Sequence, residues 1–250
     1  MSANRREPGL SVIVTVYTET EAIRETVQRL LKNAGDQAYE IILVVAPRAS
    51  LETMQICHEV ARSCDLVKVL VQRTGPGVGR ALREGMAAAS HECVAIMSAD
   101  LETEPEAVER MYSRMQETGA DVVVGSRWAK GGGFVGYDRV KLVCNWFFQK
   151  FFQLAYGTRL NDLSYGFKMF RCEVIESIAW ESTHHTIYLE TTLKPLLHAY
   201  KMEQVPTVWI SRREGESVNS FFRNFDYVKL ALALRWQSLL RSVPRLAQNA

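Results

Sequence analysis

Hydrophobic positions follow two different periods along the first half of the chain. Short β-branched runs with few charges, typical of strands buried on both faces, alternate with stretches of helical periodicity. The runs predict five strands, at residues 10–16, 40–45, 66–71, 93–97 and 121–124. The gaps predict helices at about residues 51–63, 78–90 and 105–118, and one before the second strand that Gly35 is expected to cap. Because right-handed crossovers join such units, we expect an α/β fold with a Rossmann-like, mostly parallel sheet, helices on both faces and a ligand crevice at the carboxyl ends of the strands.

The second half of the chain is less regular. It has a glycine-rich loop at residues 131–136 and an aromatic-rich helical stretch at about 138–156. No linker, repeat or low-complexity tract separates the halves. We therefore expect one domain over residues 1–220, with a donor half at about 10–127 and an acceptor half at about 128–220.

Residues 221–250 are expected to form an amphipathic helix and a tail. Apolar residues recur there at spacings of three and four, at Phe221, Phe225, Val228, Leu232, Trp236 and Leu239. Cations surround this stripe, at Arg223, Lys229, Arg235, Arg241 and Arg245. An interfacial helix on anionic lipid has this pattern, and so has a helix packed on the domain or in a dimer. The pattern alone does not choose between them.

Composition narrows the classes of protein that fit. The 250 residues are 47% hydrophobic and 23% charged, which suits one sizeable core. A formal net charge of +2 gives no general attraction to nucleic acid, so no nucleic-acid partner is expected. The five cysteines are odd in number and lack zinc-site spacing, as reduced thiols of a cytoplasmic protein would. No apolar run is long enough to span a membrane, so any membrane contact is expected to be peripheral, at the inner face.

Two acidic residues follow the fourth expected strand, in the segment Ile96-Met-Ser-Ala-Asp-Leu-Glu102. Side chains two residues apart in an extended chain point the same way, so Asp100 and Glu102 can share one hard cation. A nucleoside diphosphate leaving group needs such a cation because negative charge gathers on it. The alternative is that the acids only favour the positive end of the next helix.

Five motifs then occur in the order found in family-two glycosyltransferases. They are Val12-Ile-Val-Thr-Val-Tyr-Thr-Glu19, Ser98-Ala-Asp-Leu-Glu102, Val124-Gly-Ser-Arg127, Asp162-Leu-Ser-Tyr-Gly-Phe-Lys168 and Gly215-Glu-Ser217. Over about residues 10–220 the chain resembles this family, above all its enzymes that load a sugar onto a polyprenyl phosphate. The resemblance implies a GT-A fold, a nucleoside diphosphate sugar as donor and Mg²⁺ or Mn²⁺ as cofactor.

The resemblance also implies roles on the donor side. Thr15, Tyr17 and Glu19 match positions that line the nucleotide site. Asp100 matches a metal ligand, and Glu102 stands where relatives have a Gln that also reaches the metal.

Two arginines match positions near the donor phosphates, which the fixed fork of guanidinium donors suits well. They are Arg127, after the fifth expected strand, and Arg212, just before the Gly-x-Ser motif. Either could instead be an ordinary surface charge.

Asp162 and Lys168 match the stretch between the donor sugar and the acceptor. With a hydroxyl acceptor, Asp162 would be the general base of an inverting displacement. A phosphate acceptor is already anionic, so Arg127, Lys168 and Arg212 would instead position it. A third possibility makes Asp162 a turn residue after Asn161.

The chain departs from the family pattern in its donor-site acids. Ala46 and Pro47 replace an acidic pair where the base is read, Ser98 replaces the first Asp of Asp-x-Asp, and Val218 replaces a lysine. Three hypotheses follow: an inverting transferase with a polyprenyl-phosphate acceptor, a transferase with a soluble hydroxyl acceptor, and a non-catalytic binding protein with a transferase fold.

Overall fold

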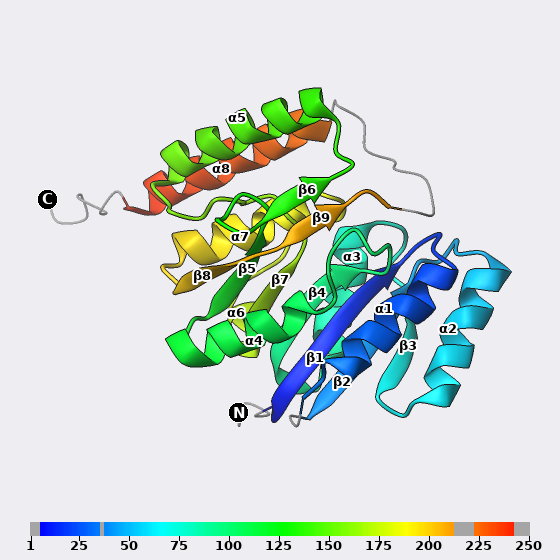
Figure 1. The fold of residues 1–250 in the computed structure, drawn as a ribbon. Coiled ribbons are helices and arrows are strands. Elements are labelled where there is room, and N and C mark those ends of the chain that lie inside the picture. Colours follow the sequence, from blue (N-terminus) through cyan, green and yellow to red (C-terminus); the bar gives the residue numbers. More distant parts are fainter. Residues whose placement is uncertain (1–5, 36–37, 213–222, 243–250) are drawn as a thin grey trace, which may run out of the picture.

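The computed structural model describes residues 6–35, 38–212 and 223–242. Its centre is a seven-stranded sheet in the order β3-β2-β1-β4-β7-β5-β8 (Figure 1). The strands are β1 (Glu7–Val16), β2 (Tyr39–Val45), β3 (Val67–Val71), β4 (His91–Ser98), β5 (Val122–Ser126), β7 (Lys168–Arg171) and β8 (Met202–Pro206). The apolar runs predicted the first five of these to within a few residues. In β2 every side chain is buried, on both faces of the sheet, as expected of a parallel strand inside a sheet.

Helices cover both faces of the sheet, which confirms the predicted α/β architecture. One face packs against α1 (Glu21–Lys32), α2 (Leu51–Ser63) and α4 (Ala107–Thr118) in a core that includes Ile23, Ile56 and Met111. The other packs against α3 (Val78–Ala88), α6 (Cys172–Ser177) and α7 (Ile187–Leu197). The alternate side chains of each strand point to opposite faces, so one continuous apolar run supplies both cores.

Three local expectations were wrong. The strand β3 lies at the edge of the sheet, so its residues after Val67 are partly exposed rather than buried on both faces. The cap of α1 is Asn33, and Gly35 instead takes a positive φ of 64° in the following turn. The strand β7 was not predicted at all. It runs antiparallel between β4 and β5 and, like the edge strand β8, comes from the second half of the chain.

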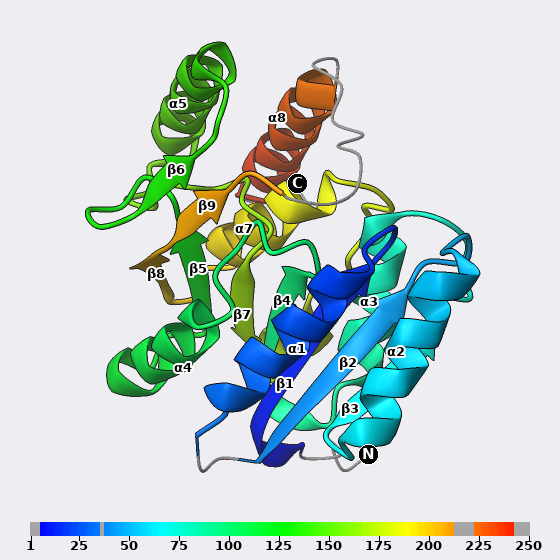
Figure 2. The same ribbon diagram turned by 45° about the vertical axis from the view of Figure 1, so that its right-hand side comes forward.

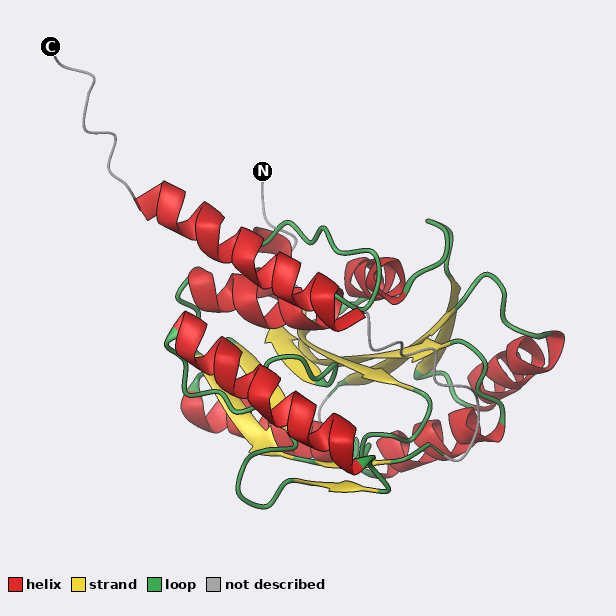
Figure 3. Cartoon of the chain, turned by 90° about the horizontal axis from the view of Figure 1, so that it is seen from above, coloured by secondary structure: helices red, strands yellow, loops and turns green. Residues whose placement is uncertain are grey.

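The second half of the chain adds a layer at one end of the molecule (Figures 1 and 2). A small parallel pair, β6 (Gly133–Val135) and β9 (Val208–Ile210), leads to the long helices α5 (Arg139–Tyr156) and α8 (Arg223–Ser242). A third apolar cluster joins α5, α7 and α8, and includes Phe152, Leu193 and Ala231. The hydroxyl of Tyr156 donates a hydrogen bond to the carbonyl oxygen of Ala231 at 2.6 Å. Viewed from above, α5 and α8 lie across the same end of the molecule (Figure 3).

The predicted apolar stripe of the C-terminal helix faces away from the domain. Leu232 and Trp236 are 58% and 66% exposed, whereas Ala231 and Leu234, outside the predicted stripe, are the residues buried against the domain. Phe221 and Arg245 of this segment lie outside the described residues, and so does the Gly215-Glu-Ser217 motif that precedes it. Within the described ranges, no helix is long and apolar enough to cross a membrane.

Candidate active site

The acidic residues after β4 converge on one cation at the carboxyl edge of the sheet. The Nε of Arg212 lies 2.7 Å from Oε1 of Glu102, and its Nη2 lies 3.2 Å from Oδ2 of Asp100. Asp100 and Glu102 follow β4, and Arg212 follows β9. The antiparallel bridge between Thr103 and Trp209 brings these two segments together. Both carboxylates therefore face one guanidinium, and their binding of one divalent ion stays a prediction.

The local geometry that orients these acids differs from the extended chain assumed from the sequence. Leu101 has a φ of 56°, so the segment bends between the two acids. A left-handed leucine costs about 1–2 kcal/mol, which surrounding contacts must offset. One such contact is the backbone N–H of Glu102, which donates to Oδ1 of Asp100 at 3.1 Å. The indole of Trp209 donates to Oε2 of Glu102 at 3.1 Å, which fixes the second carboxylate.

The surroundings of Asp100 disfavour its ionised form. The residue is 7% exposed. Burial, and then the neighbouring carboxylate of Glu102, raise the pKa of Asp100 to about 6, although Arg212 acts in the opposite direction. A buried carboxylate with a raised pKa favours a site that gains a cation, because a cation compensates for the desolvation of the charged form.

The expected nucleotide side of the site lies at the end of β1. Thr15 pairs with Ser98 across β1 and β4, and its hydroxyl donates to the carbonyl oxygen of Met97 at 3.3 Å. Glu19 is buried, and its carboxylate accepts hydrogen bonds from the backbone N–H groups of Tyr17 at 2.6 Å and of Thr18 at 3.1 Å. The Tyr17 side chain is 52% exposed. Glu19 therefore shapes the loop that carries Tyr17, and the ring of Tyr17 is open to solvent.

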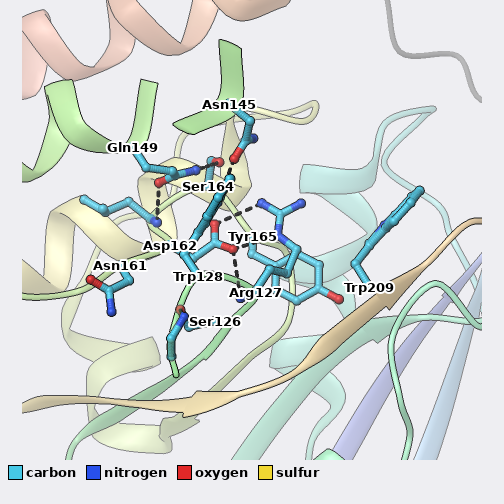
Figure 4. A network of polar contacts seen from close by, with 12 residues as sticks. Ser126, Arg127, Trp128, Asn145, Gln149, Asn161, Asp162, Ser164, Tyr165 and Trp209 are labelled. Carbon is cyan, nitrogen blue, oxygen red and sulfur yellow. Dashed lines mark hydrogen bonds and ion pairs between the residues drawn. The ribbon is translucent and has the colours of Figure 1, made fainter. Parts of the chain in front are cut away.

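Arg127 and Asp162 form a buried ion pair (Figure 4). The guanidinium donates from Nε to Oδ2 at 2.6 Å and from Nη2 to Oδ1 at 2.9 Å, and the backbone N–H of Arg127 reaches Oδ2 at 3.2 Å. The guanidinium also lies over the rings of Tyr165, at 4.4 Å, and Phe134, at 5.2 Å. Burial opposes the charge on Arg127, but Asp162 more than offsets it, so the pKa of Arg127 is raised. With these three contacts the carboxylate of Asp162 is directed at Arg127 and is not exposed to solvent.

Lys168 is fully buried beside this pair. Its Nζ donates to the carbonyl oxygens of Tyr165 at 2.5 Å and Tyr188 at 2.6 Å. Burial lowers the pKa of Lys168 to about 7, although Asp162 acts in the opposite direction. The structure therefore divides the predicted residues into two groups. An outer group at the carboxyl edge of the sheet consists of Asp100, Glu102 and Arg212, and an inner group consists of Arg127, Asp162 and Lys168.

Tyr165 connects the two groups. Its hydroxyl lies 2.6 Å from the hydroxyl of Thr103, which follows the acids, and its ring packs under Arg127.

A second set of polar contacts ties the loop that carries Tyr165 to α5. The side-chain amide of Gln149 donates to Oγ of Ser164 at 2.7 Å and accepts from the backbone N–H of Leu163 at 2.8 Å.

Sequence reasoning missed Trp209 and Gln149 as parts of the site. Trp209 holds Glu102, and Gln149 is 2% exposed in an aromatic-rich stretch of α5. A glutamine between two pairs of phenylalanines was the available signal for Gln149, because a buried amide needs partners. The three-residue strand that carries Trp209 has no pattern long enough to predict.

These features define a class of protein. An open, mostly parallel sheet flanked by helices, with an acidic pair at its carboxyl edge and an arginine facing the pair, is a GT-A glycosyltransferase architecture. The sequence model described as "Glycosyl transferase family 2" matches residues 11–179, and the chain belongs to this family.

Two characterised relatives match most of this chain. The dolichol-phosphate mannosyltransferase of Pyrococcus furiosus is 26% identical over 240 residues, and the match covers 91% of this chain and 64% of that protein. The chain thus spans less than two thirds of the length of that relative. The undecaprenyl-phosphate mannosyltransferase of Micrococcus luteus is 25% identical over 237 residues, covering 91% of this chain and 96% of that protein.

Solved structures confirm the fold. The glucosyl-3-phosphoglycerate synthase of Mycobacterium tuberculosis, in complex with Mn²⁺, UDP and phosphoglyceric acid, superposes with a TM-score of 0.68 at 14% identity, covering 92% of this chain and 78% of that one. Its complex with Mg²⁺ and UDP gives a TM-score of 0.67 at 16% identity, covering 92% and 79%. At this identity the likeness establishes the GT-A fold, and the roles of individual residues in this chain stay predictions.

Proposed function

We propose that the protein transfers a sugar, with inversion, from a nucleoside diphosphate sugar to the phosphate of a polyprenyl-type lipid, assisted by Mg²⁺ or Mn²⁺. The observation that carries the proposal is the convergence of Asp100 and Glu102 on a single cationic group at the carboxyl edge of the sheet. In open α/β sheets that edge is where ligands bind. The names of the two mannosyltransferases support the lipid phosphate as acceptor.

The residues present fit a hard divalent ion. Oδ2 of Asp100 and Oε1 of Glu102 are the oxygens that face Arg212, and carboxylate oxygen is the ligand such ions prefer. The described part of the chain has no cluster of three or more potential ligands. Mg²⁺ is commonly held by one or two carboxylates together with substrate phosphates and water, so two suffice. When bound, the ion would stabilise the charge that develops on the leaving diphosphate.

The inner group of residues favours a phosphate acceptor over a hydroxyl acceptor. A hydroxyl acceptor needs a base, and the carboxylate of Asp162 is bound on both oxygens by Arg127. A lipid phosphate attacks as an anion and needs no base. We call the segment between α5 and β7, residues 157–167, the acceptor loop. We assign Arg127, Asp162 and Lys168 the task of holding this loop in shape, and Arg212 the contact with the donor diphosphate.

The helix α5 supports the idea that the reaction takes place at a membrane surface. Two of its polar side chains are turned inward: Gln149 binds the acceptor loop, and Asn145 accepts a hydrogen bond from the indole of Trp128 at 2.9 Å. Six of its apolar residues are turned outward, at Val140, Val143, Trp146, Phe147, Phe151 and Leu154, with exposed fractions from 42% to 86%. A helix that faces water does not expose so many apolar side chains, whereas a helix that rests on lipid does.

The charge of this end of the molecule suits an anionic surface. The helix α5 contains no acidic residue, and Lys141 and Lys150 are exposed on it. On α8, exposed Lys229 and Arg235 accompany the outward stripe, and Asp226 is its one acid. Cations beside an anionic leaflet are worth about 1 kcal/mol each. We therefore define the lipid face as the outward apolar residues of α5 and α8 together, and we propose anionic lipid as its partner.

Sedimentation with vesicles tests the lipid face. We expect the protein to bind vesicles of phosphatidylglycerol and phosphatidylcholine, and the double substitution Phe147→Ser and Trp236→Ser to abolish binding. Leu51→Ser is the matched control, because Leu51 is 91% exposed on α2, away from this face. Equal binding by the double variant and the control would refute the lipid face. A concentration-dependent dimer that the double variant abolishes would identify the face as a protein interface instead.

A transfer assay tests the reaction. Radiolabelled nucleoside diphosphate sugars are incubated with polyprenyl phosphate, phosphoglyceric acid or water, and the product is separated by organic extraction. We expect label in the organic phase, dependent on Mg²⁺ or Mn²⁺, lost in Asp100→Asn and retained in the control Asp65→Asn on the exposed surface. Label only in an aqueous product would favour the soluble acceptor. No turnover of any donor would favour the binding-protein hypothesis.

A further inference from the structure

Arg212 stands between the two carboxylates that the proposed function assigns to a divalent ion. The side chain of Arg212 is 21% exposed, that of Glu102 21% and that of Asp100 7%, so the three charges meet in a largely dry place. Among the described residues, Arg212 is the cationic side chain that forms an ion pair with either acid. The guanidinium and a divalent ion would therefore compete for the same oxygens.

Each carboxylate is also held by a contact that does not involve Arg212. Asp100 accepts a hydrogen bond from the backbone N–H of Glu102, and Glu102 accepts one from the indole of Trp209. The acids would thus keep their positions if the guanidinium left. Arg212, by contrast, ends a long side chain whose planar fork can pair with a carboxylate or with a phosphate.

We propose that Arg212 acts as an exchangeable counter-ion: it neutralises the acidic pair before the donor binds, and it moves to the diphosphate when a divalent ion takes its place. This inference rests on the proposed function. With Arg212 between them, the two carboxylates leave one net negative charge. A divalent ion and a doubly charged diphosphate together add no net charge, so the exchange needs no further counter-ion.

The exchange predicts coupling between the ion and the donor. The ion alone must displace the guanidinium of Arg212 from both carboxylates and supplies no anion in exchange, so it binds weakly. When the diphosphate is present, the displaced guanidinium gains a partner, and both ligands bind more tightly. Coupling between two ligands is commonly about 5- to 150-fold, and by linkage each ligand feels the same factor.

Removing Arg212 should separate these effects. In Arg212→Met, Mn²⁺ alone should bind at least ~5-fold more tightly than in the wild type, because its competitor is gone. UDP or GDP with saturating Mn²⁺ should bind more weakly, because the phosphate contact is gone. Arg212→Lys should lie between the two, since a lysine keeps the charge and loses the fork. A purely structural arginine would weaken both ligands, and a purely phosphate-binding arginine would leave Mn²⁺ alone unaffected.

Electron paramagnetic resonance of free Mn²⁺ in titrations of the full chain measures the first quantity, and calorimetry of UDP and GDP with Mn²⁺ measures the second. The matched control is Arg110→Met, which removes an arginine paired with Glu104 at 2.8 Å in the same region. Circular dichroism establishes that each variant is folded. Tighter Mn²⁺ binding in Arg212→Met than in the control supports the exchange, and equal or weaker binding overturns it. If the wild type binds no Mn²⁺ even with nucleotide, the metal assignment of the proposed function fails as well.

Discussion

Replacing Asp162 with asparagine would test whether the inner group is structural. The substitution keeps the volume of the side chain and one acceptor oxygen, but it removes the charge that faces Arg127. Arg127 is buried and cannot lose its proton, so it would remain as an unpaired charge between Tyr165 and Phe134. Removing one partner of a buried pair costs about 3–5 kcal/mol, a large fraction of the stability of a typical domain.

Urea denaturation at pH 7 measures this loss. The chain offers a matched control in the pair of Arg29 and Glu106, which has the same two-pronged geometry, with both contacts at 2.7 Å, but has side chains 33% and 37% exposed. Because solvent screens the pair of Arg29 and Glu106, Glu106→Gln should lower the free energy of unfolding by less than about 1 kcal/mol. The double substitution Arg127→Met and Asp162→Leu should cost less than Asp162→Asn, because no charge is left unpaired.

Similar losses for Asp162→Asn and Glu106→Gln would refute this reasoning. A fully stable Asp162→Asn protein without transferase activity would instead favour Asp162 as the general base.

The sequence alone predicts that an Arg127→Lys protein folds and loses turnover. The buried pair adds a loss of stability, because a lysine makes neither the two-pronged contact nor the same stacking on Tyr165.

Three further changes have defined outcomes. Because the pKa of Lys168 is about 7 in the folded protein and higher in the unfolded chain, the unfolded chain binds more protons above pH 7. The free energy of unfolding should therefore rise by about 2 kcal/mol between pH 7 and pH 9 in urea titrations, and Lys168→Met should remove the rise. Gly79→Ala would push a Cβ into the carbonyl oxygen of Ser182, and urea denaturation should show a loss of about 1–3 kcal/mol. Tyr156→Phe removes the hydrogen bond to Ala231 and should lower the free energy of unfolding by about 1 kcal/mol, with faster amide exchange in α8.

The sequence predicted the elements whose burial dictates their pattern. The strand β1 reads as a largely apolar run without charges from Leu10 to Val16 because both of its faces are covered, and α2 begins and ends where its periodicity indicates. The strand β7 has four residues with a cation at each end, so no local pattern marks it. Its conformation is decided by β4 and β5, which hold it by hydrogen bonds.

The site was predictable as a set of residues but not as a set of contacts. Motif order identified Asp100 and Glu102 as metal ligands and Arg212 as a phosphate contact, and the structure brings these three side chains together. Motif order equally suggested Arg127 for phosphate and Asp162 for acid–base chemistry. That the two bind each other depends on how loops 35 residues apart pack, which sequence spacing does not encode.

The outward direction of the C-terminal stripe also lay beyond sequence reasoning. A stripe that includes Leu232 and Trp236 predicts an amphipathic helix, but either face of such a helix can meet the domain. The small Ala231 allows α8 to approach α5 closely enough for the Tyr156 hydrogen bond. Close packing therefore selects the inner face, and the bulkier residues are left outside.

The position of β7 has a consequence for how the chain can fold during synthesis. The strands β4 and β5 do not pair with each other, since β7 lies between them and reaches both. When the growing chain has reached Ser126, β4 and β5 have been synthesised but the strand that pairs with both has not. The pairing becomes possible only when β7, Lys168–Arg171, has been synthesised. Closing such distant contacts carries a loop-entropy cost and slows folding. A protein divided between the donor and acceptor halves should therefore give two fragments that fold together or not at all.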